Sequence, residues 1–417
     1  MHQVQSLLVN TYGLKIQDIR NEFRMLKYRL NGKQLIYLDS AATSQKPKRV
    51  MDRLQKFYLE EYAKPKESHS LSQKATEGLE GTRKKIAAFI GAKSEKEIVF
   101  SRGCTESINM IAGAFGRGLL KEGDEVLIAE LEHHANIVPW LMACEQSGAK
   151  VKAIPINKKG EIDLDAYEKM LSDRTKMVAV SHTSHALGNK LPVEEIVAMA
   201  HKKGIPVMLD GAQAAPHMPV KMQELDCDFY VFSGHKMGTP SGVGVLYGKE
   251  EWLQKLPPDE GGADMTKNVT LESYTAAALP HKFEAGTMPF AEIIAFGTLI
   301  DYLNELDMHK LEKYEQELLR YATQRMSELD RVNIMGTDGE KEPVLSISLD
   351  GLDVKKLEKF LNDEYNIEAR AGTLTAQPLM KILGKEGLLR ASFCYYNTAE
   401  EIDTYIGAVE EFISKNG

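Results

Sequence analysis

The sequence predicts an α/β fold with a mostly parallel, seven-stranded sheet, followed by a smaller α+β domain. Between residues 98 and 247, short apolar runs typical of strands alternate with helical patterns, and repeated βα units form parallel sheets that are covered on both faces. After about residue 290, two long helical stretches are followed by shorter strands. We therefore expect a large domain over residues 35–292 and a small domain over residues 1–34 and 293–417.

The first part of the chain is expected to be a helical lead-in, because its apolar residues recur at helical spacing until Asn31-Gly32 marks a turn. Residues 35–39 form a short predicted strand. The small residues that follow at 40–44 permit close approach of the backbone to a ligand. Two helices are predicted between residues 46 and 91.

The remaining elements follow in order along the two domains. Strands of the large sheet are expected at residues 98–100, 125–129, 151–154, 177–180, 205–209, 229–232 and 243–247. Helices between them are expected to begin near residues 136, 163 and 192. In the small domain we expect helices at 291–305, 307–329, 353–363 and from 398, with strands near 343–350, 366–371 and 387–393.

The composition excludes several classes of protein. The 417 residues are 43% hydrophobic and 27% charged, as in an ordinary globular enzyme. A net charge of −8 gives no electrostatic reason to expect nucleic acid or an anionic membrane as a partner. The sequence shows no apolar run of membrane-spanning length and no signal pattern at its start. Four scattered cysteines favour a reducing compartment, so we expect a cytoplasmic protein with no disulfide framework and no metal site.

Two strand ends carry the residues of a cofactor site. Lys236 follows the apolar strand at 229–232, and Asp210 ends the apolar strand before it. In α/β proteins, ligands bind beyond the carboxyl ends of the strands. A lysine that forms a Schiff base, together with an aspartate that faces a pyridine nitrogen, is the pairing that pyridoxal 5'-phosphate requires. The sequence therefore predicts a pyridoxal phosphate site with Lys236 and Asp210 at its centre.

A phosphate cradle is predicted at the strand that ends near residue 100. There Gly103-Cys104-Thr105 precedes an apolar-periodic helix, so free backbone N–H groups and the helix dipole would hold an anion. Histidines follow two other strand ends, in the segments 131–136 and 181–188. No cysteine or carboxylate spacing supports zinc binding there. A planar imidazole that stacks on a cofactor suits the first of these segments better.

The sequence resembles fold type I, class V aminotransferases, and most closely the Suf-type cysteine desulfurases, from about Asp18 to the C-terminus. The segments that carry the resemblance are 37–47 (Tyr-Leu-Asp-Ser-Ala-Ala-Thr-Ser-Gln-Lys-Pro), 132–140 (Glu-His-His-Ala-Asn-Ile-Val-Pro-Trp), 210–213 (Asp-Gly-Ala-Gln), 232–236 (Phe-Ser-Gly-His-Lys) and 283–287 (Phe-Glu-Ala-Gly-Thr). Together these segments are specific. The resemblance implies a fold type I transferase that is a pyridoxal phosphate enzyme acting on an amino acid.

The resemblance also implies a role for individual residues. Lys236 would hold the cofactor and move protons, Asp210 would keep the pyridine nitrogen protonated, and His133 would stack on the ring and take part in catalysis. The other implied cofactor contacts are Gln213 on the phenolic oxygen, and Cys104 (through its backbone), Thr105, Ser233 and His235 on the phosphate. Thr287 would reach the phosphate of the other subunit, so the implied assembly is a homodimer with shared active sites. The implied substrate-binding residues are Arg390, which would clamp the carboxylate, with Ala42, His185 and Thr375.

The sequence departs from the desulfurase pattern around the substrate. The family's nucleophile lies in the pattern Arg-x-Gly-His-His-Cys-Ala-x-Pro-Leu, whereas residues 370–379 read Arg-Ala-Gly-Thr-Leu-Thr-Ala-Gln-Pro-Leu. Thr375 therefore occupies the cysteine position, and an alcohol supplies essentially no nucleophilic anion at neutral pH and forms no persulfide. His185 stands where the family has the asparagine of Ser-Asn-x-Leu-Gly. The cofactor residues are kept while the substrate residues differ.

These departures favour a changed reaction over a desulfurase. Without a nucleophile at residue 375, a β-substituent of the substrate would leave, giving pyruvate and ammonia, so we expect a β-eliminating C–S lyase. Epimerisation, decarboxylation with aldol addition, transamination and a residual desulfurase activity are alternatives within the same family. A non-catalytic scaffold homologue is the alternative from another class.

Overall fold

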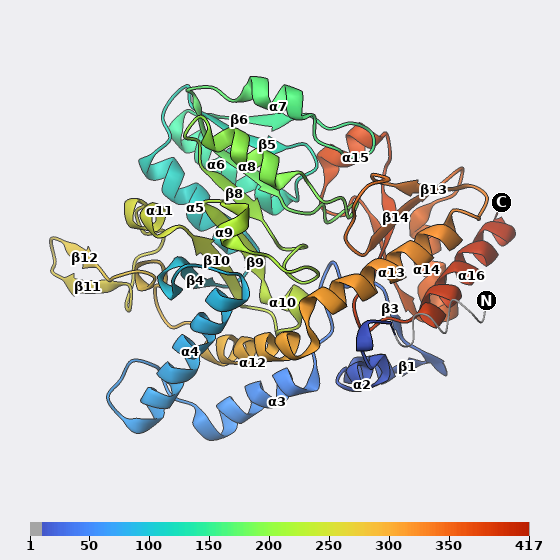
Figure 1. Cartoon of the computed structure of the whole chain (residues 1–417), viewed down its shortest axis with the longest axis horizontal. Helices are drawn as coiled ribbons and strands as arrows, with labels where there is room; N and C mark the ends of the chain where they lie inside the picture. The colour runs from blue at the N-terminus through green and yellow to red at the C-terminus, as the bar shows by residue number, and fades with distance from the viewer. Residues whose placement is uncertain (1–10, 417) are drawn as a thin grey trace.

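The structure is a computed structural model that describes residues 11–416, so the first ten residues of the predicted small domain lie outside the described part. A seven-stranded sheet forms its centre, in the order β4-β10-β9-β8-β7-β5-β6 (Figure 1). Only β10 runs antiparallel to its neighbours, which confirms the mostly parallel sheet. The strands are β4 (Ile98–Ser101), β5 (Glu125–Ala129), β6 (Lys150–Ile154), β7 (Thr175–Ser181), β8 (Val207–Asp210), β9 (Phe229–Ser233) and β10 (Gly244–Gly248).

Both faces of this sheet are buried under helices, because successive side chains of a strand point to opposite faces. In β9, Phe229 and Val231 pack in a cluster with α5 and α6, whereas Tyr230 and Phe232 pack in a second cluster with α8 and α12. These covering helices are α5 (Cys104–Gly118), α6 (Val138–Ser147), α8 (Val193–His201) and α12 (Phe290–Leu306). The continuous apolar runs of the sequence are thus explained by burial on two sides.

The small domain is built on a four-stranded antiparallel sheet in the order β13-β14-β17-β16. Its strands are β13 (Val332–Met335), β14 (Val344–Leu349), β16 (Arg370–Gly372) and β17 (Leu388–Ser392), and its helices are α13 (Met308–Met326), α14 (Val354–Tyr365), α15 (Gln377–Leu383) and α16 (Ala399–Asn416). The predicted α+β character is confirmed. Strand β13 was not predicted, because its four residues are only half-buried and show no alternation.

The N-terminal segment packs against the small domain, since Arg20 Nη2 donates to Glu401 Oε1 at 2.7 Å and the Phe23 and Tyr395 ring centroids lie 5.9 Å apart. Helices α2 (Ile16–Asn21) and η2 (Arg24–Lys27) are followed by a hairpin of β1 (Arg29–Leu30) and β2 (Lys33–Gln34), whose turn is the predicted Asn31-Gly32. Strand β3 (Ile36–Tyr37) then pairs in parallel with β15 (Ile367–Glu368). Strand β3 follows the domain boundary proposed at residue 35, yet it pairs with a strand of the small domain. The boundaries at residues 35 and 292 therefore stay a prediction.

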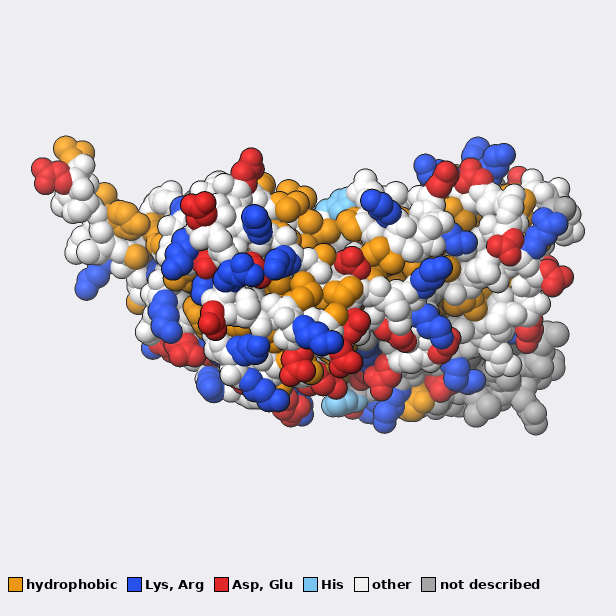
Figure 2. All heavy atoms as spheres, turned by 90° about the horizontal axis from the view of Figure 1, so that it is seen from above, with side chains coloured by type: hydrophobic (Ala, Val, Ile, Leu, Met, Phe, Trp, Pro, Cys, Tyr) orange, Lys and Arg blue, Asp and Glu red, His pale blue; other side chains and the backbone are white. Residues whose placement is uncertain are grey.

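The remaining elements surround the sheet. Helix α12 packs against α3 (Lys48–Lys56) and α4 (Ser70–Phe89), which are the two helices expected between residues 46 and 91. A hairpin of β11 (Thr266–Val269) and β12 (Tyr274–Ala276) projects from the end of the molecule opposite the small domain (Figures 1 and 2). Shorter helices are η1 (Thr11–Gly13), η3 (Phe57–Glu61), η4 (Glu95–Glu97), η5 (His134–Asn136), α7 (Leu164–Met170), α9 (Met222–Leu225), α10 (Gly234–Met237), α11 (Glu250–Lys255) and η6 (His281–Phe283). Within residues 11–416, no helix combines the length and the apolar character needed to cross a membrane.

Candidate active site

A cavity of about 590 Å³ lies where the strands of the large sheet end and the small domain begins. Asp210 is the last residue of β8, Ser233 is the last residue of β9, and these strands are paired in parallel. The cavity brings together every predicted site residue except Thr287: Ala42, Cys104, Thr105, His133, His185, Asp210, Gln213, Ser233, His235, Lys236, Thr375 and Arg390. The lining residues come mainly from the large sheet and from the segment 370–390, which lie far apart in the sequence.

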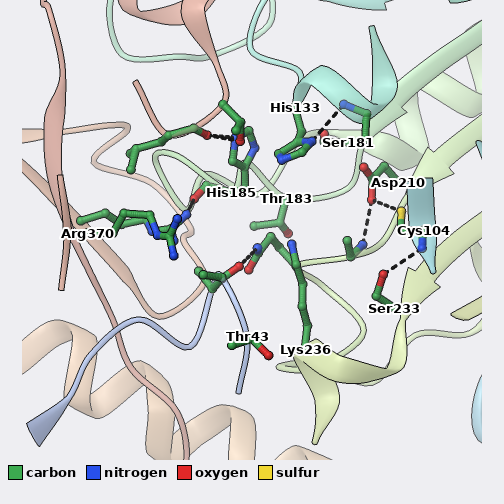
Figure 3. A pocket seen from close by; sticks show the side chains of 18 of the residues that line it. Thr43, Cys104, His133, Ser181, Thr183, His185, Asp210, Ser233, Lys236 and Arg370 are labelled. Atoms are coloured by element: carbon green, nitrogen blue, oxygen red, sulfur yellow. Dashed lines mark hydrogen bonds between the residues drawn. The ribbon is translucent and has the colours of Figure 1, made fainter. Parts of the chain in front are cut away.

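Lys236 and Asp210 lie in the same cavity, Asp210 at the end of β8 and Lys236 in helix α10 (Gly234–Met237), which follows the neighbouring β9 (Figure 3). Burial lowers the pKa of the Lys236 ammonium, which favours the neutral amine that attacks a carbonyl. Within residues 11–416, Lys236 Nζ makes no hydrogen bond or ion pair, and both hydrogen bonds to the Asp210 carboxylate reach Oδ1. The donors are the Ala212 backbone N–H at 2.9 Å and the Cys104 thiol at 3.2 Å.

His133 has a defined tautomer. Its Nδ1 accepts a hydrogen bond from the Ala135 backbone N–H at 3.0 Å, so the proton of the neutral ring is on Nε2. Burial, with the positive charge of Lys236, lowers the pKa of His133 to about 4. A neutral, planar imidazole with a fixed orientation is suited to stack on an aromatic cofactor, which is its predicted role.

The end of the cavity near α5 has the groups of the predicted phosphate cradle. The first residues of α5 face the end of β9, where the Cys104 backbone N–H donates to Ser233 Oγ at 2.8 Å. Strand β10 comes so close that a Cβ atom on Gly244 would lie 2.4 Å from the Gly103 Cα, so only glycine fits at residue 244. His235 Nδ1 lies 3.1 Å from Thr43 Oγ1, and burial lowers the pKa of its imidazole to about 4.

The small-residue segment at 40–44 forms another wall of the cavity. Gln213 Nε2 donates to the Ala41 carbonyl at 2.7 Å, so the predicted contact of Gln213 with a phenolic oxygen would compete with this bond. The Ser44 N–H donates to the His235 carbonyl at 3.2 Å and ties the segment to the turn that holds Lys236. The small side chains of residues 40–44 thus let their backbone lie close to the turn that carries Lys236.

Arg390 is buried, and a carboxylate that the sequence analysis did not single out holds it in place. Arg390 Nη2 donates to Asp39 Oδ1 at 2.9 Å, and Nη1 donates to the His185 carbonyl at 2.9 Å. Asp39 also pairs with Arg370, whose Nη2 lies 2.8 Å from Oδ2. In the sequence, Arg370 is the first residue of the segment that was compared with the desulfurase pattern, and Asp39 is the last residue of a predicted strand. Nothing local in the sequence indicates that they meet.

Two buried polar atoms at the cavity lack a partner. Arg390 Nε and Thr183 Oγ1 make no hydrogen bond within the described residues. Unsatisfied buried polar groups are rare and call for a ligand or water. An arginine edge suits a carboxylate, and a hydroxyl beside Lys236 and Asp210 suits a polar cofactor. The donor set of the cavity therefore fits pyridoxal phosphate together with an amino acid.

The loop at residues 373–375 closes the side of the cavity that faces the small domain. Leu374 and Thr375 both adopt left-handed backbone conformations, with φ of 53° and 56°. The Leu374 side chain is buried, its carbonyl lies 2.8 Å from His185 Nε2, and the Thr375 side chain is exposed. The Thr375 carbonyl accepts a hydrogen bond from the His134 N–H at 3.1 Å.

The four cysteines are all free and buried. Cys104 is the one that lines the cavity, and its thiol donates to Asp210. Burial, with the neighbouring Asp210 charge, raises the pKa of this thiol well above its ordinary value, so it stays protonated. Cys394 lies just after β17 and packs in the apolar cluster that runs from the large sheet into the small domain. In the described part of the chain, no group of three or more His, Cys, Asp or Glu side chains could hold a metal ion.

Thr287 is exposed and lies outside the cavity lining. It follows Glu284, which forms a buried ion pair with Arg83: Nη1 and Nη2 lie 2.6 and 3.0 Å from its two oxygens. The Phe100 backbone N–H donates to the same carboxylate at 2.8 Å. This buried pair fixes the 283–287 segment against β4.

Most of the chain matches known proteins. A family model described as "Aminotransferase class-V" matches residues 36–405. The chain belongs to the class V aminotransferase family. This family uses pyridoxal phosphate, so the cofactor of the chain is pyridoxal 5'-phosphate and the chain is an enzyme.

Relatives within the family are named cysteine desulfurases. A "Probable cysteine desulfurase" of Vibrio cholerae is 43% identical over 401 residues, which are 96% of this chain and 99% of that protein. Another, from Mycolicibacterium paratuberculosis, is 45% identical over 94% of this chain, but the match spans only 58% of that protein's length. A solved structure, cysteine desulfurase CsdA (S-sulfonic acid) from Escherichia coli, has a TM-score of 0.89 at 35% identity and covers 96% of this chain and 99% of its own. The apo cysteine desulfurase of Thermococcus onnurineus has a TM-score of 0.90 at 35% identity, over 96% of this chain and 98% of that one. The fold type I architecture is therefore shown.

Proposed function

We propose that this enzyme is a β-eliminating C–S lyase that acts on cysteine or on an amino acid with a sulfur substituent at the β-carbon. The proposal is supported by the loop at residues 373–375, where the exposed Thr375 occupies the position that the resemblance assigns to the desulfurase nucleophile. The one cavity cysteine, Cys104, is buried, protonated and bonded to Asp210. No thiolate is therefore available near the substrate to take up sulfur.

The residues of the cavity have complementary tasks in this reaction. Pyridoxal phosphate, when bound, withdraws electrons from the amino acid so that its α-proton becomes acidic and a β-substituent can leave. Arg390 binds the substrate carboxylate through its free Nε edge, because Nη1 and Nη2 each already donate one bond within the protein. Lys236, with its lowered amine pKa, is the base that takes the α-proton. The sulfur leaves with the bonding electron pair and a proton, and hydrolysis gives pyruvate and ammonia.

We also propose that the enzyme is a homodimer in which Thr287 serves the site of the other subunit. Two features support this arrangement. Thr287 is exposed and does not line its own cavity. The projecting hairpin presents apolar side chains to solvent, with Val269 67% and Tyr274 55% exposed (Figure 2). Val269 and Tyr274 are paired across the hairpin, and contiguous exposed apolar patches mark association surfaces. The cytoplasmic location stays a prediction.

The lyase proposal is tested with the holoenzyme and L-cysteine, L-cystine and S-methyl-L-cysteine, each incubated separately. The expected products are pyruvate and ammonia, identified by mass spectrometry, in amounts equal to the sulfur released. Alanine with sulfide would show a desulfurase and refute the proposal, as would a product that keeps or extends the amino-acid skeleton. A Lys236→Ala variant is the control, because it removes the base and the Schiff-base amine and should form none of these products.

A further inference from the structure

His185 connects the two sides of the substrate pocket. Figure 3 shows His185 in the pocket. Its backbone carbonyl accepts from Arg390 Nη1, and its ring Nε2 lies 2.8 Å from the carbonyl of Leu374 in the facing loop. Its ring also contacts His133 edge to face, with centroids 4.7 Å apart. We propose that His185 is a positioning residue that holds the loop at residues 373–376 as a fixed wall of the substrate pocket, in register with Arg390.

The chemistry of the two partners sets the direction of the His185–Leu374 bond. A carbonyl oxygen only accepts hydrogen bonds, so Nε2 carries the proton and donates. Burial lowers the pKa of His185 well below its ordinary value, and the ring is therefore neutral with its remaining lone pair on Nδ1. Because Nε2 keeps its proton in both charge states of the ring, this bond is independent of pH.

The loop needs such an anchor because its backbone is in an unfavourable conformation. Leu374 and Thr375 are consecutive residues with positive φ, a region that branched side chains avoid. Besides the His185 bond, the loop is held by the buried Leu374 side chain, by the His134 N–H on the Thr375 carbonyl, and by the Ala376 N–H on the Thr373 carbonyl at 2.9 Å. Within the loop, Thr375 Oγ1 also donates to the Leu374 carbonyl at 2.5 Å, so this oxygen accepts two hydrogen bonds. The His185 bond is the one that joins the loop to the segment whose carbonyl also holds Arg390.

The length of the side chain explains why histidine stands at residue 185. An asparagine places its amide nitrogen at the δ position, one bond short of the imidazole Nε2, and cannot reach the Leu374 carbonyl from the same backbone. A glutamine places its amide nitrogen at the ε position and can donate there. His185→Asn and His185→Gln are therefore a matched pair of substitutions: both introduce an amide donor, but only the glutamine amide is long enough to reach the Leu374 carbonyl.

A fixed wall determines which β-substituents fit. The carboxylate of the substrate is held at Arg390, and His185 fixes the opposite loop relative to it, so the space for the β-substituent is constant. The enzyme should then favour compact substituents, such as a thiol or a methylthio group, over a benzylthio group. This consequence rests on the proposed lyase function, whereas the fixed loop rests on geometry alone.

Hydrogen–deuterium exchange of the holoenzyme tests the anchor directly. In peptides that cover residues 373–376, His185→Asn should raise amide exchange at least about fivefold, which corresponds to the loss of one net hydrogen bond. His185→Gln should stay within about twofold of the wild type, and protection in the wild type should not change between pH 6 and pH 8 once intrinsic rates are corrected. Exchange in β7 and β8 serves as the internal reference for global stability.

The results separate this proposal from the lyase function. Wild-type exchange at residues 373–376 in His185→Asn, or equal exchange in His185→Asn and His185→Gln, would overturn the anchor. If the anchor is right, His185→Asn should also raise kcat/KM for S-benzyl-L-cysteine relative to L-cysteine, while His185→Gln should not. If the enzyme forms no pyruvate from any substrate, the proposed lyase function is refuted. The exchange measurement would still decide whether His185 anchors residues 373–376.

Discussion

Glu284→Gln should strongly destabilise the protein, because it removes one partner of a buried ion pair. The Arg83 side chain is fully buried, and Glu284 is 2% exposed. Gln keeps the size of the side chain and an oxygen for the Phe100 N–H, so the loss is mainly one of charge. The Arg83 guanidinium would keep only Glu80, a half-exposed carboxylate, as its counter-ion.

Two independent estimates of the cost agree. The Arg83 charge and the hydrogen bonds lower the pKa of Glu284 from 4.5 to about 2, although burial alone would raise it. At 1.36 kcal/mol for each pH unit, this difference corresponds to about 3 kcal/mol. Removing one partner of a buried pair typically costs about 3–5 kcal/mol. Because the pKa is lowered on folding, this stability is present above pH 4.5 and is lost as the pH falls toward 2.

Urea unfolding at pH 7 and at pH 3 measures this effect. At pH 7, Glu284→Gln should lower the free energy of unfolding by about 3 kcal/mol. This loss should be nearly independent of salt concentration because the ion pair is buried. The difference between variant and wild type should shrink at pH 3. Asp52→Asn is the matched control, since it breaks the exposed pair with Lys48 and should cost under about 0.5 kcal/mol. A loss below about 1 kcal/mol at pH 7 for Glu284→Gln would refute the argument.

Three further predictions concern other groups. In the native protein, no cysteine should react with a thiol reagent, whereas four should react in denaturant, because all are buried; Thr375→Cys should add one fast-reacting thiol. Arg390→Lys should raise KM for the amino acid at least about tenfold, because lysine lacks the planar edge that binds a carboxylate; steady-state kinetics measures this. Burial raises the pKa of Glu342 from 4.5 to about 7, so its contribution to stability is present below pH 4.5 and is lost as the pH rises through 7. Glu342→Gln should therefore gain stability relative to the wild type between pH 5 and pH 8 in urea unfolding.

Much of the fold could be predicted because local pattern and burial agree. The strands of the central sheet are apolar throughout, and in the structure both of their faces are covered by helices. Helix α13 has the periodic apolar face that the sequence indicated. The hairpin of β11 and β12 was missed because most of its residues are exposed, so no buried face imposes a pattern on its sequence.

The candidate site was predictable where residues lie at strand ends and in specific motifs. Asp210 ends β8 and Lys236 follows β9, and their meeting follows from the parallel pairing of these two strands. The pairing of Asp39 with Arg370 and Arg390 was not predictable, because it joins residues more than three hundred positions apart in the chain. The contact of His185 with Leu374 was hidden for the same reason, since it depends on how the two domains meet.

The pairing of β3 with β15 has a consequence for synthesis of the chain. Residues 36 and 37 find their partners only at residues 367 and 368, and the Asp39–Arg370 contact spans 331 positions. At about 5–20 residues per second, the ribosome needs roughly 20–70 s to supply that partner. During this interval the N-terminal segment must wait with apolar residues such as Phe23 and Leu38 uncovered, although both are fully buried in the finished protein. Chaperone dependence should therefore be greatest before the last fifty residues emerge.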